Sequence, residues 1–274
     1  MSSKQPDALF KMGLCYQRLA EGDGDLGEKV RFAKQASVNL GAALKMCMII
    51  GNFKSEEWIT EAISETSKIA DFYFDNILPQ IEDSTQRILQ AEAYAYDLSQ
   101  QPCHDLVVKV DQLVALMCFD HISDLLRRKE HTLCDPYLQH MLIFMTRAEE
   151  RYALQKQPET SVGRDLKLLR ADYQTSKDIT EAWQALEAGY LITDFAMKEM
   201  GSGDVQSALD LAWNARDKFK DSERLSEGLV DEIYFRSKSY QAFLFLNVTK
   251  RMQRRFTKKY LSLQLLRTLQ ILTG

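Results

Sequence analysis

The sequence predicts an all-α protein built from stacked antiparallel helical hairpins. Turn residues are sparse, because no glycine occurs between Gly51 and Gly163 and no proline follows Pro158. Strands and β-hairpins need frequent turn residues, so this scarcity favours long helices. Apolar side chains also recur at steps of three and four residues, which is the period of a helix face, and no segment has the pattern of a strand.

Three helices are expected in the first 79 residues. Asp7 is suited to cap the first, which ends near Ala20, ahead of the loop GDGDLG. The second, over 28–50, has a centre that is apolar nearly all round (SVNLGAALKMCMII), so we expect it to be buried on several sides. The third covers 55–79 and ends at a proline, a residue that cannot continue a helix.

Three further helices are expected before residue 155. One covers 82–100 and ends before Pro102, and the next, over 105–129, repeats leucine, valine and methionine at steps of three and four. The last begins at Pro136, since proline is well suited to the first position of a helix.

The segment QKQPETSVG at 155–163 is the best linker candidate. It separates a long-helix part over 1–154 from a second part over 164–274, and the two form either separate domains or one continuous domain. Short connections between helices favour antiparallel neighbours. The helices of the second part are expected at 165–188, 190–201, 204–220, 224–247 and 249–272.

The segment at 190–216 has a distinctive spacing of small residues. It is expected to form two short helices joined by a tight turn, with small side chains where another helix approaches closely. This spacing resembles the second half of a tetratricopeptide repeat, and residues 9–16 resemble the first helix of that repeat. The resemblance implies a tetratricopeptide-like (TPR-like) α-solenoid, and an irregular helical bundle is the alternative. The predicted packing seam consists of Ala196, Gly203, Ala208, Ala212 and Ala215.

The net charge of −4 conceals a basic end. Residues 233–274 contain nine Lys or Arg and no acid, which leaves a net charge of −13 on the first 232 residues. Because phosphate affinity comes from basic surface, an acidic body is a poor general nucleic-acid binder. Basic side chains recur as adjacent pairs every four residues near the end of the chain. This predicted partner-binding stripe consists of Lys250, Arg251, Arg254, Arg255, Lys258 and Lys259.

Three interpretations of the basic stripe stay open. Its helix caps the helical stack, or it docks an acidic protein or another subunit, or it lies on an anionic membrane. No window of the sequence has the roughly 18 apolar residues that a membrane span needs. We expect other proteins as partners, with no specific nucleic acid and no transmembrane segment.

Histidine and cysteine gather between residues 103 and 140. Cys118 and His121 are one helical turn apart, and His131 and Cys134 lie across the following turn, which gives four ligands of the types that zinc binds. The spacing C-x2-H-x9-H-x2-C matches no familiar zinc motif, and cysteine is commonly a small buried side chain. We therefore expect a structural role for these residues, and no cofactor.

The cysteine count also predicts the compartment. Five cysteines in a chain of 274 residues argue against a disulfide framework and favour a reducing environment. The first ten residues, MSSKQPDALF, lack the apolar core of a signal peptide. The expected location is intracellular, either cytoplasmic or nuclear.

The sequence contains no strong catalytic signature. It lacks G-x-S-x-G, a phosphate loop ending in G-K-[ST], and H-E-x-x-H. Glu61, Glu65, Asp71 and Asp75 lie on one predicted helix, and DFYFD at 71–75 resembles the aspartate-rich helices of all-α terpene synthases. That resemblance implies an apolar cavity, magnesium and a diphosphate substrate, although the second metal-binding motif of the family is not recognisable here.

These patterns favour a protein–protein interaction scaffold or adaptor built from TPR-like hairpins. Stacked hairpins create a continuous groove that holds a peptide or a helix of another protein. The degenerate, long-helix repeats of meiotic chromosome scaffolds are similar in general texture. The alternative is an all-α, terpene-synthase-like enzyme that uses magnesium and a diphosphate substrate.

Overall fold

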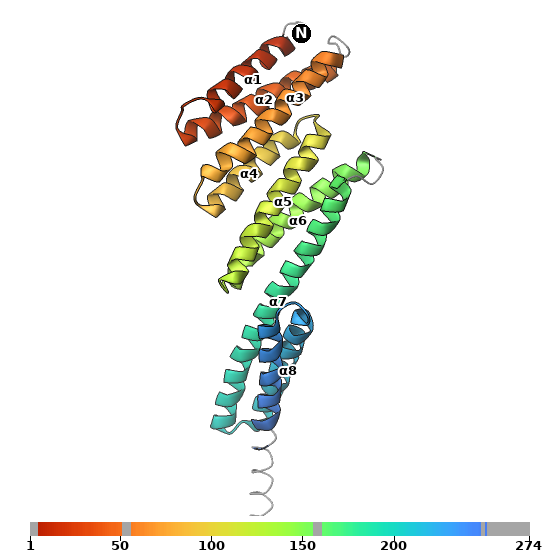
Figure 1. Cartoon of the computed structure of the whole chain (residues 1–274). Helices are drawn as coiled ribbons and strands as arrows, with labels where there is room; N and C mark the ends of the chain where they lie inside the picture. Colours follow the sequence, from red (N-terminus) through yellow and green to blue (C-terminus); the bar gives the residue numbers. More distant parts are fainter. Residues whose placement is uncertain (1–4, 51–55, 156–160, 248–249, 251–274) are drawn as a thin grey trace, which may run out of the picture. The chain divides into compact units, whose positions relative to one another are not determined.

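The computed structural model describes residues 5–50, 56–155, 161–247 and 250. All regular elements in this part of the chain are helical and none is a strand, which confirms the all-α prediction (Figure 1). The chain divides into two compact units, each described here by itself. Unit 1 comprises Met1–Arg128 and Asp135–Tyr173, and unit 2 comprises Lys129–Cys134 and Gln174–Gly274. The division falls inside helix α7 (Ser161–Ser202), beyond the predicted linker.

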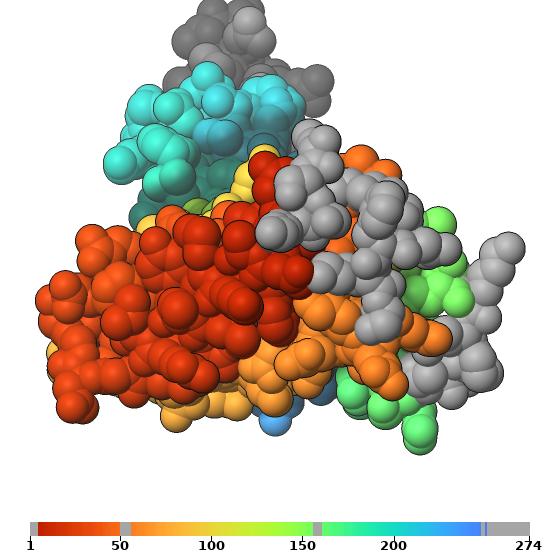
Figure 2. Space-filling model, turned by 90° about the horizontal axis from the view of Figure 1, so that it is seen from above, coloured from red at the N-terminus to blue at the C-terminus, as the bar shows by residue number. Residues whose placement is uncertain are grey.

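Unit 1 begins with α1 (Gln5–Glu21), α2 (Leu26–Ile50) and α3 (Glu56–Phe72), which pack against one another. The red side chains of α1 form the outer surface at this end of the unit (Figure 2). Asp25 caps α2, because its Oδ1 accepts the backbone N–H of Glu28 at 2.8 Å. The acidic loop before α2 therefore has a structural role, because it provides the residue that caps this helix.

α1 and α2 approach closely at Gly13. A Cβ on Gly13 would lie 2.6 Å from Cγ of Leu40 and 3.2 Å from its backbone nitrogen, so a larger residue does not fit. Leu40 is fully buried in the centre of α2, in agreement with the predicted burial of this segment. Met48 and Ile49, near the end of the helix, are exposed.

The helix over 55–79 changes its geometry before it reaches the proline. α3 ends at Phe72 and passes into a π-helical turn (Tyr73–Ile77) and then a 3-10 turn (Leu78–Gln80). The wider turn directs Tyr73 into the core, where its ring stacks on Tyr94 with centroids 4.4 Å apart. Burial raises the pKa of both phenols, so this pair is neutral at all ordinary pH values.

The remaining helices of unit 1 are α4 (Ser84–Ser99), α5 (His104–Arg127), α6 (Cys134–Leu154) and the first part of α7. α5 and α6 are joined by a buried ion pair, in which Nε and Nη2 of Arg147 donate to the carboxylate of Asp111. Asp111 is fully buried. Burial raises the pKa of its carboxyl group, and the guanidinium of Arg147 offsets part of that rise.

Unit 2 packs the second part of α7 against α8 (Val205–Ser226) and the helical residues 231–247, drawn in blue in Figure 1. Ser222 on α8 connects all three segments. Its hydroxyl donates to the carbonyl oxygen of Ala182 at 2.8 Å and accepts from the hydroxyl of Ser237 at 2.9 Å. These buried hydroxyl groups therefore satisfy one another.

Two predicted helix boundaries in this unit are wrong. The sequence predicts a break at residue 189, whereas α7 is one continuous helix. Gly189 instead provides room for a neighbour, since a Cβ there would lie 2.6 Å from Cε1 of Phe219. The helix predicted over 224–247 is also interrupted, because α8 ends at Ser226 and a turn containing Gly228, with φ of +74°, precedes residue 231. The segment predicted at 249–272 lies outside the described residues, apart from Lys250.

The predicted turn at residue 203 is present, but Gly203 does not belong to the packing seam that the sequence predicts. Gly203 is exposed and adopts φ of +102°, a conformation that favours glycine at a helix end. Asp204 then caps α8 by accepting the backbone N–H of Ser207 at 3.0 Å. The other members of the predicted seam are buried, namely Ala196, Ala208, Ala212 and Ala215.

Substitution of Gly189 tests the close approach of α7 to α8. We expect Gly189→Ala to lower the free energy of unfolding by about 1–3 kcal/mol, because the new methyl group overlaps the Phe219 ring. Gly201→Ala is the matched control on the same helix, since no atom lies within 4 Å of a Cβ there. It should leave stability unchanged or raise it by up to about 1 kcal/mol. Urea unfolding of both variants measures the difference, and equal stabilities would contradict the packing.

Removal of Arg147 tests the buried ion pair. We expect Arg147→Met to cost about 3–5 kcal/mol at neutral pH, because Asp111 then remains buried without its partner. The loss of unfolding free energy relative to the wild type should become smaller as the pH falls. Burial raises the pKa of Asp111, and protonation then removes the buried charge. Urea unfolding at two pH values checks this. The double variant Asp111→Leu/Arg147→Met is the control and should be much less destabilised than the single variant.

Candidate interaction site

A groove with an apolar floor lies between α5 and the first part of α7, within unit 1. Its volume is about 320 Å³, and Leu116 and Leu168 on its floor are 45% and 64% exposed. Such exposure of large apolar side chains is typical of a surface that another molecule covers. The lining residues are Lys109, Gln112, Leu113, Leu116, Asp165, Leu168, Leu169 and Asp172.

The core of unit 1 determines which residues of α7 reach the groove. Leu166 is buried against Val108 and Ala148, with Val162 packed on the same cluster. The side chain amide of Gln112 donates to the carbonyl oxygen of Val162 at 3.3 Å, which ties α5 to the start of α7. With Leu166 directed inward, the leucines that follow it lie along the groove.

The rim of the groove is acidic on the α7 side. Asp165 and Asp172 lie seven residues apart, or about 10 Å along the helix, with the two leucines between them. On the α5 side the ammonium group of Lys109 lies 2.6 Å from Oδ1 of Asp71, so that its charge is balanced. The groove therefore combines an apolar floor with two carboxylates.

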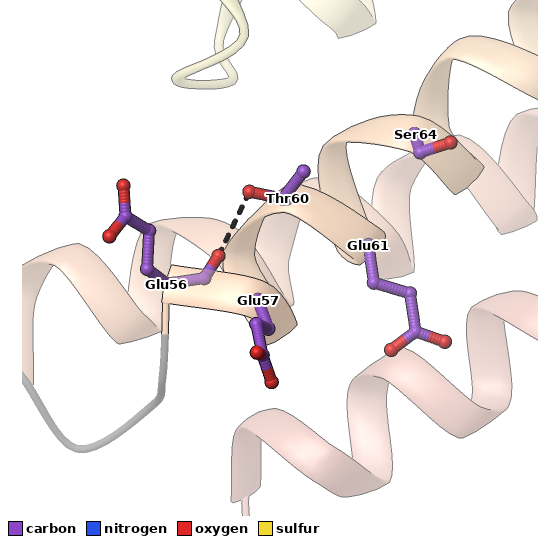
Figure 3. Close-up of a pocket in the computed structure, with 5 residues that line it drawn as sticks. All are labelled: Glu56, Glu57, Thr60, Glu61 and Ser64. Atoms are coloured by element: carbon purple, nitrogen blue, oxygen red, sulfur yellow. Dashed lines mark hydrogen bonds between the residues drawn. The ribbon is translucent and has the colours of Figure 1, made fainter.

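A second, wide hollow lies on α3 and is lined by acids. Its volume is about 560 Å³, and its lining includes Glu56, Glu57 and Glu61. Figure 3 shows that Glu56 points away from Glu57 and Glu61, while Thr60 donates back to the carbonyl oxygen of Glu56 at 2.9 Å. The three carboxylates do not converge on one point.

The carboxylates predicted for terpene-synthase-like chemistry are also separate from one another. Glu65 is paired with Lys68 at 2.6 Å, and Asp71 is paired with Lys109. Asp75 is exposed. Glu65 is thus paired within α3 and Asp71 is paired with α5, and these acids form no common cluster around a cavity.

The residues proposed as zinc ligands have other neighbours. Cys118 is fully buried in α5, and the ring of His121 lies edge-on to Tyr137 with centroids 4.3 Å apart. Burial lowers the pKa of His121, with a further lowering from Arg128. Over the described ranges, no group of three or more His, Cys, Asp or Glu side chains is arranged to hold a metal ion.

His131 and Cys134 belong to unit 2, whereas Cys118 and His121 belong to unit 1. The His131 ring stacks on Trp183, with centroids 5.5 Å apart and planes 14° apart. Its Nε2 lies 3.0 Å from a carboxylate oxygen of Glu187, without the alignment of a hydrogen bond. This buried histidine therefore packs as an aromatic side chain.

The basic stripe falls almost entirely outside the described residues. Lys250 is helical and exposed, and the structure does not describe Arg251, Arg254, Arg255, Lys258 or Lys259. The described helices include none that is both long and apolar enough to span a membrane.

Comparison with known proteins gives no relative. No family model, no curated protein and no solved structure matches the chain.

Sequence reasoning did not identify the groove as a site. Leu113 and Leu116 belong to the apolar period of α5, a pattern that normally marks a core face. The only available signal was that Leu168 and Leu169 are flanked by Asp165 and Asp172, which is unusual for a fully buried face.

Thiol labelling tests the burial of the cysteines. All five are free thiols, and Cys15 alone among them is exposed. Burial raises the pKa of Cys103 to about 11 and that of Cys118 to about 12, so these thiols are protonated near neutral pH. We expect one thiol of the native chain to react rapidly with a disulfide reagent at pH 8, and the other four only after unfolding. Cys15→Ser should abolish the rapid phase, and a second rapid thiol would contradict the structure.

Proposed function

We propose that this protein is a non-enzymatic interaction scaffold, which binds an apolar peptide or helix of another protein in the groove between α5 and α7. The observation that carries the proposal is the exposed apolar floor, Leu116 and Leu168 above all. Burial of such side chains by a partner contributes about 25 cal/mol per Å² of apolar surface. Exposed leucines in a groove are thus favourable sites for a partner's apolar residues.

The order of helix contacts in unit 1 supports TPR-like stacking of hairpins. The first helices of successive hairpins touch, since α1 contacts α3, α3 is ion-paired to α5, and α5 is hydrogen-bonded to α7. The second helices do the same: Lys34 of α2 donates to Gln90 of α4 at 2.9 Å, and Thr85 of α4 is 2.9 Å from the hydroxyl of Tyr137 on α6. In helical repeats this pattern creates the surface that receives peptides.

The proposed groove lies between two first helices, α5 and α7. In this interpretation it belongs to one continuous side of the stack, formed by α1, α3, α5 and the start of α7. The carboxylates of Asp165 and Asp172 favour a partner segment that carries basic residues beside its apolar ones.

A matched pair of leucine and isoleucine variants tests the groove. Leu168→Glu places a charge on the floor, and Ile143→Glu places one on α6, outside the groove, at a side chain of similar exposure (58%, against 64% for Leu168). Because both positions are exposed, both variants should keep the melting temperature of the wild type. Quantitative affinity purification from native cells should show partners that are lost about tenfold or more with Leu168→Glu and retained with Ile143→Glu. Equal recovery with both variants would refute the groove.

A further inference from the structure

The helix over residues 231–247 in unit 2 is apolar on two opposite sides. Ile233, Ser237 and Leu244 are buried on the side that packs within the unit. The opposite side carries Phe235 and Leu246, which are 62% and 53% exposed. Large apolar side chains that gather on an exposed helix face are suited to a further contact.

Four exposed residues form a line along the outer side, which we call the outer stripe: Phe235, Ser239, Ala242 and Leu246. Their spacing of four, three and four residues is that of a coiled-coil seam. The stripe has large side chains at its two ends and small ones in its middle. It therefore has nearly the same pattern when its direction is reversed.

This reversal symmetry specifies the partner. A second copy of the helix, placed antiparallel, brings Phe235 of one chain against Leu246 of the other, and Ser239 against Ala242. Each contact then occurs twice about a twofold axis, as in an isologous dimer. The small residues at the centre allow the two helix backbones to approach closely.

The polar groups of the outer stripe are compatible with such a contact. The hydroxyl of Ser239 donates to the backbone carbonyl of Phe235 at 2.8 Å, so it can enter a dry interface without losing its hydrogen bond. Arg236 and Phe243 lie on the same edge of the stripe, and Phe243 is 45% exposed. Antiparallel pairing places each Arg236, which is ion-paired with Glu232 of its own chain at 2.7 Å, beside the Phe243 ring of the other copy.

The exposed area matches a weak, reversible dimer. A fully exposed aromatic side chain presents about 200 Å² of surface. On this basis, about 350 Å² of exposed aromatic surface per chain comes from Phe235, Phe243 and Phe245. Leu246 and the stem of Arg236 add to this area. Stable interfaces bury at least about 600 Å² per partner, so a contact through the outer stripe and these flanking side chains falls below that class and fits a weak, transient dimer.

We infer that unit 2 binds a second copy of this chain through the outer stripe, as an antiparallel pair of the helices over 231–247. This inference is independent of the groove, which lies in unit 1 and receives a different partner.

Sedimentation velocity of the full chain tests the inference at loading concentrations from about 1 μM to about 1 mM. We expect a species of twice the 31.6 kDa chain mass at high concentration, which dissociates on dilution. Phe235→Glu should give a monomer with an unchanged melting temperature. Trp213→Glu is the control, because Trp213 is 58% exposed on α8 and lies outside the stripe, and this variant should still dimerise. A monomeric wild type over the whole range, or a dimer that tolerates Phe235→Glu, would overturn the inference.

A compensating double variant tests the antiparallel register. In Phe235→Glu/Leu246→Lys, the new acid of one chain lies opposite the new base of the other only if the helices run antiparallel. We therefore expect the double variant to regain dimerisation, with an affinity that falls as salt rises. A double variant that is as monomeric as Phe235→Glu alone would contradict the proposed pairing.

Discussion

Close approach of helices at glycine residues is the constraint on which this structure depends. In unit 1 a Cβ on Gly41 would lie 2.0 Å from Cδ of Gln101, inside the side chain. Because Gly41 has no Cβ, the side chain amide of Gln101 can lie against α2 and donate to the carbonyl oxygen of Ser37 at 3.0 Å. This hydrogen bond fixes the chain beyond α4 to the middle of α2. In unit 2, Gly189 plays the same part for Phe219, which is fully buried. Because packed interiors leave few voids, such close contacts set the separation of the segments around them.

Close packing also fixes how each helix is rotated, and this rotation produces the groove. Asp111 faces α6, where Arg147 neutralises its buried charge. Leu113 and Leu116 follow at two and five residues, a spacing that places them on the opposite side of α5 at about 100° per residue. The ion pair therefore turns these leucines toward α7 and the groove. A core made only of aliphatic side chains would specify this rotation less strictly, because hydrophobic contact has no direction.

Local patterns predicted the elements of the fold better than they predicted contacts. The helical class, the burial of α2 and the turn at residue 203 follow from periodicity and from glycine and proline placement. The break predicted at residue 189 is absent, because the sequence shows that Gly189 lacks a side chain but not that Phe219 fills the space. The spacing of small residues predicts Gly203 in the seam, because spacing alone does not distinguish a packed glycine from one in a turn. The groove could not be predicted from the sequence, because apolar residues at helical spacing form the same pattern whether or not another helix covers them.

The two exposed apolar surfaces differ in symmetry, and for that reason we propose different partners for them. The outer stripe has nearly the same order of large and small side chains when it is reversed, so a second copy fits it. The α7 wall of the groove has a carboxylate at each end, Asp165 and Asp172, and in an antiparallel pair these would face the same carboxylates of the other copy. Like charges brought together at an interface cost binding free energy. Self-association is therefore disfavoured at the groove and favoured at the stripe, which agrees with our proposal of a basic, apolar segment of another protein for the groove and a second copy for the stripe.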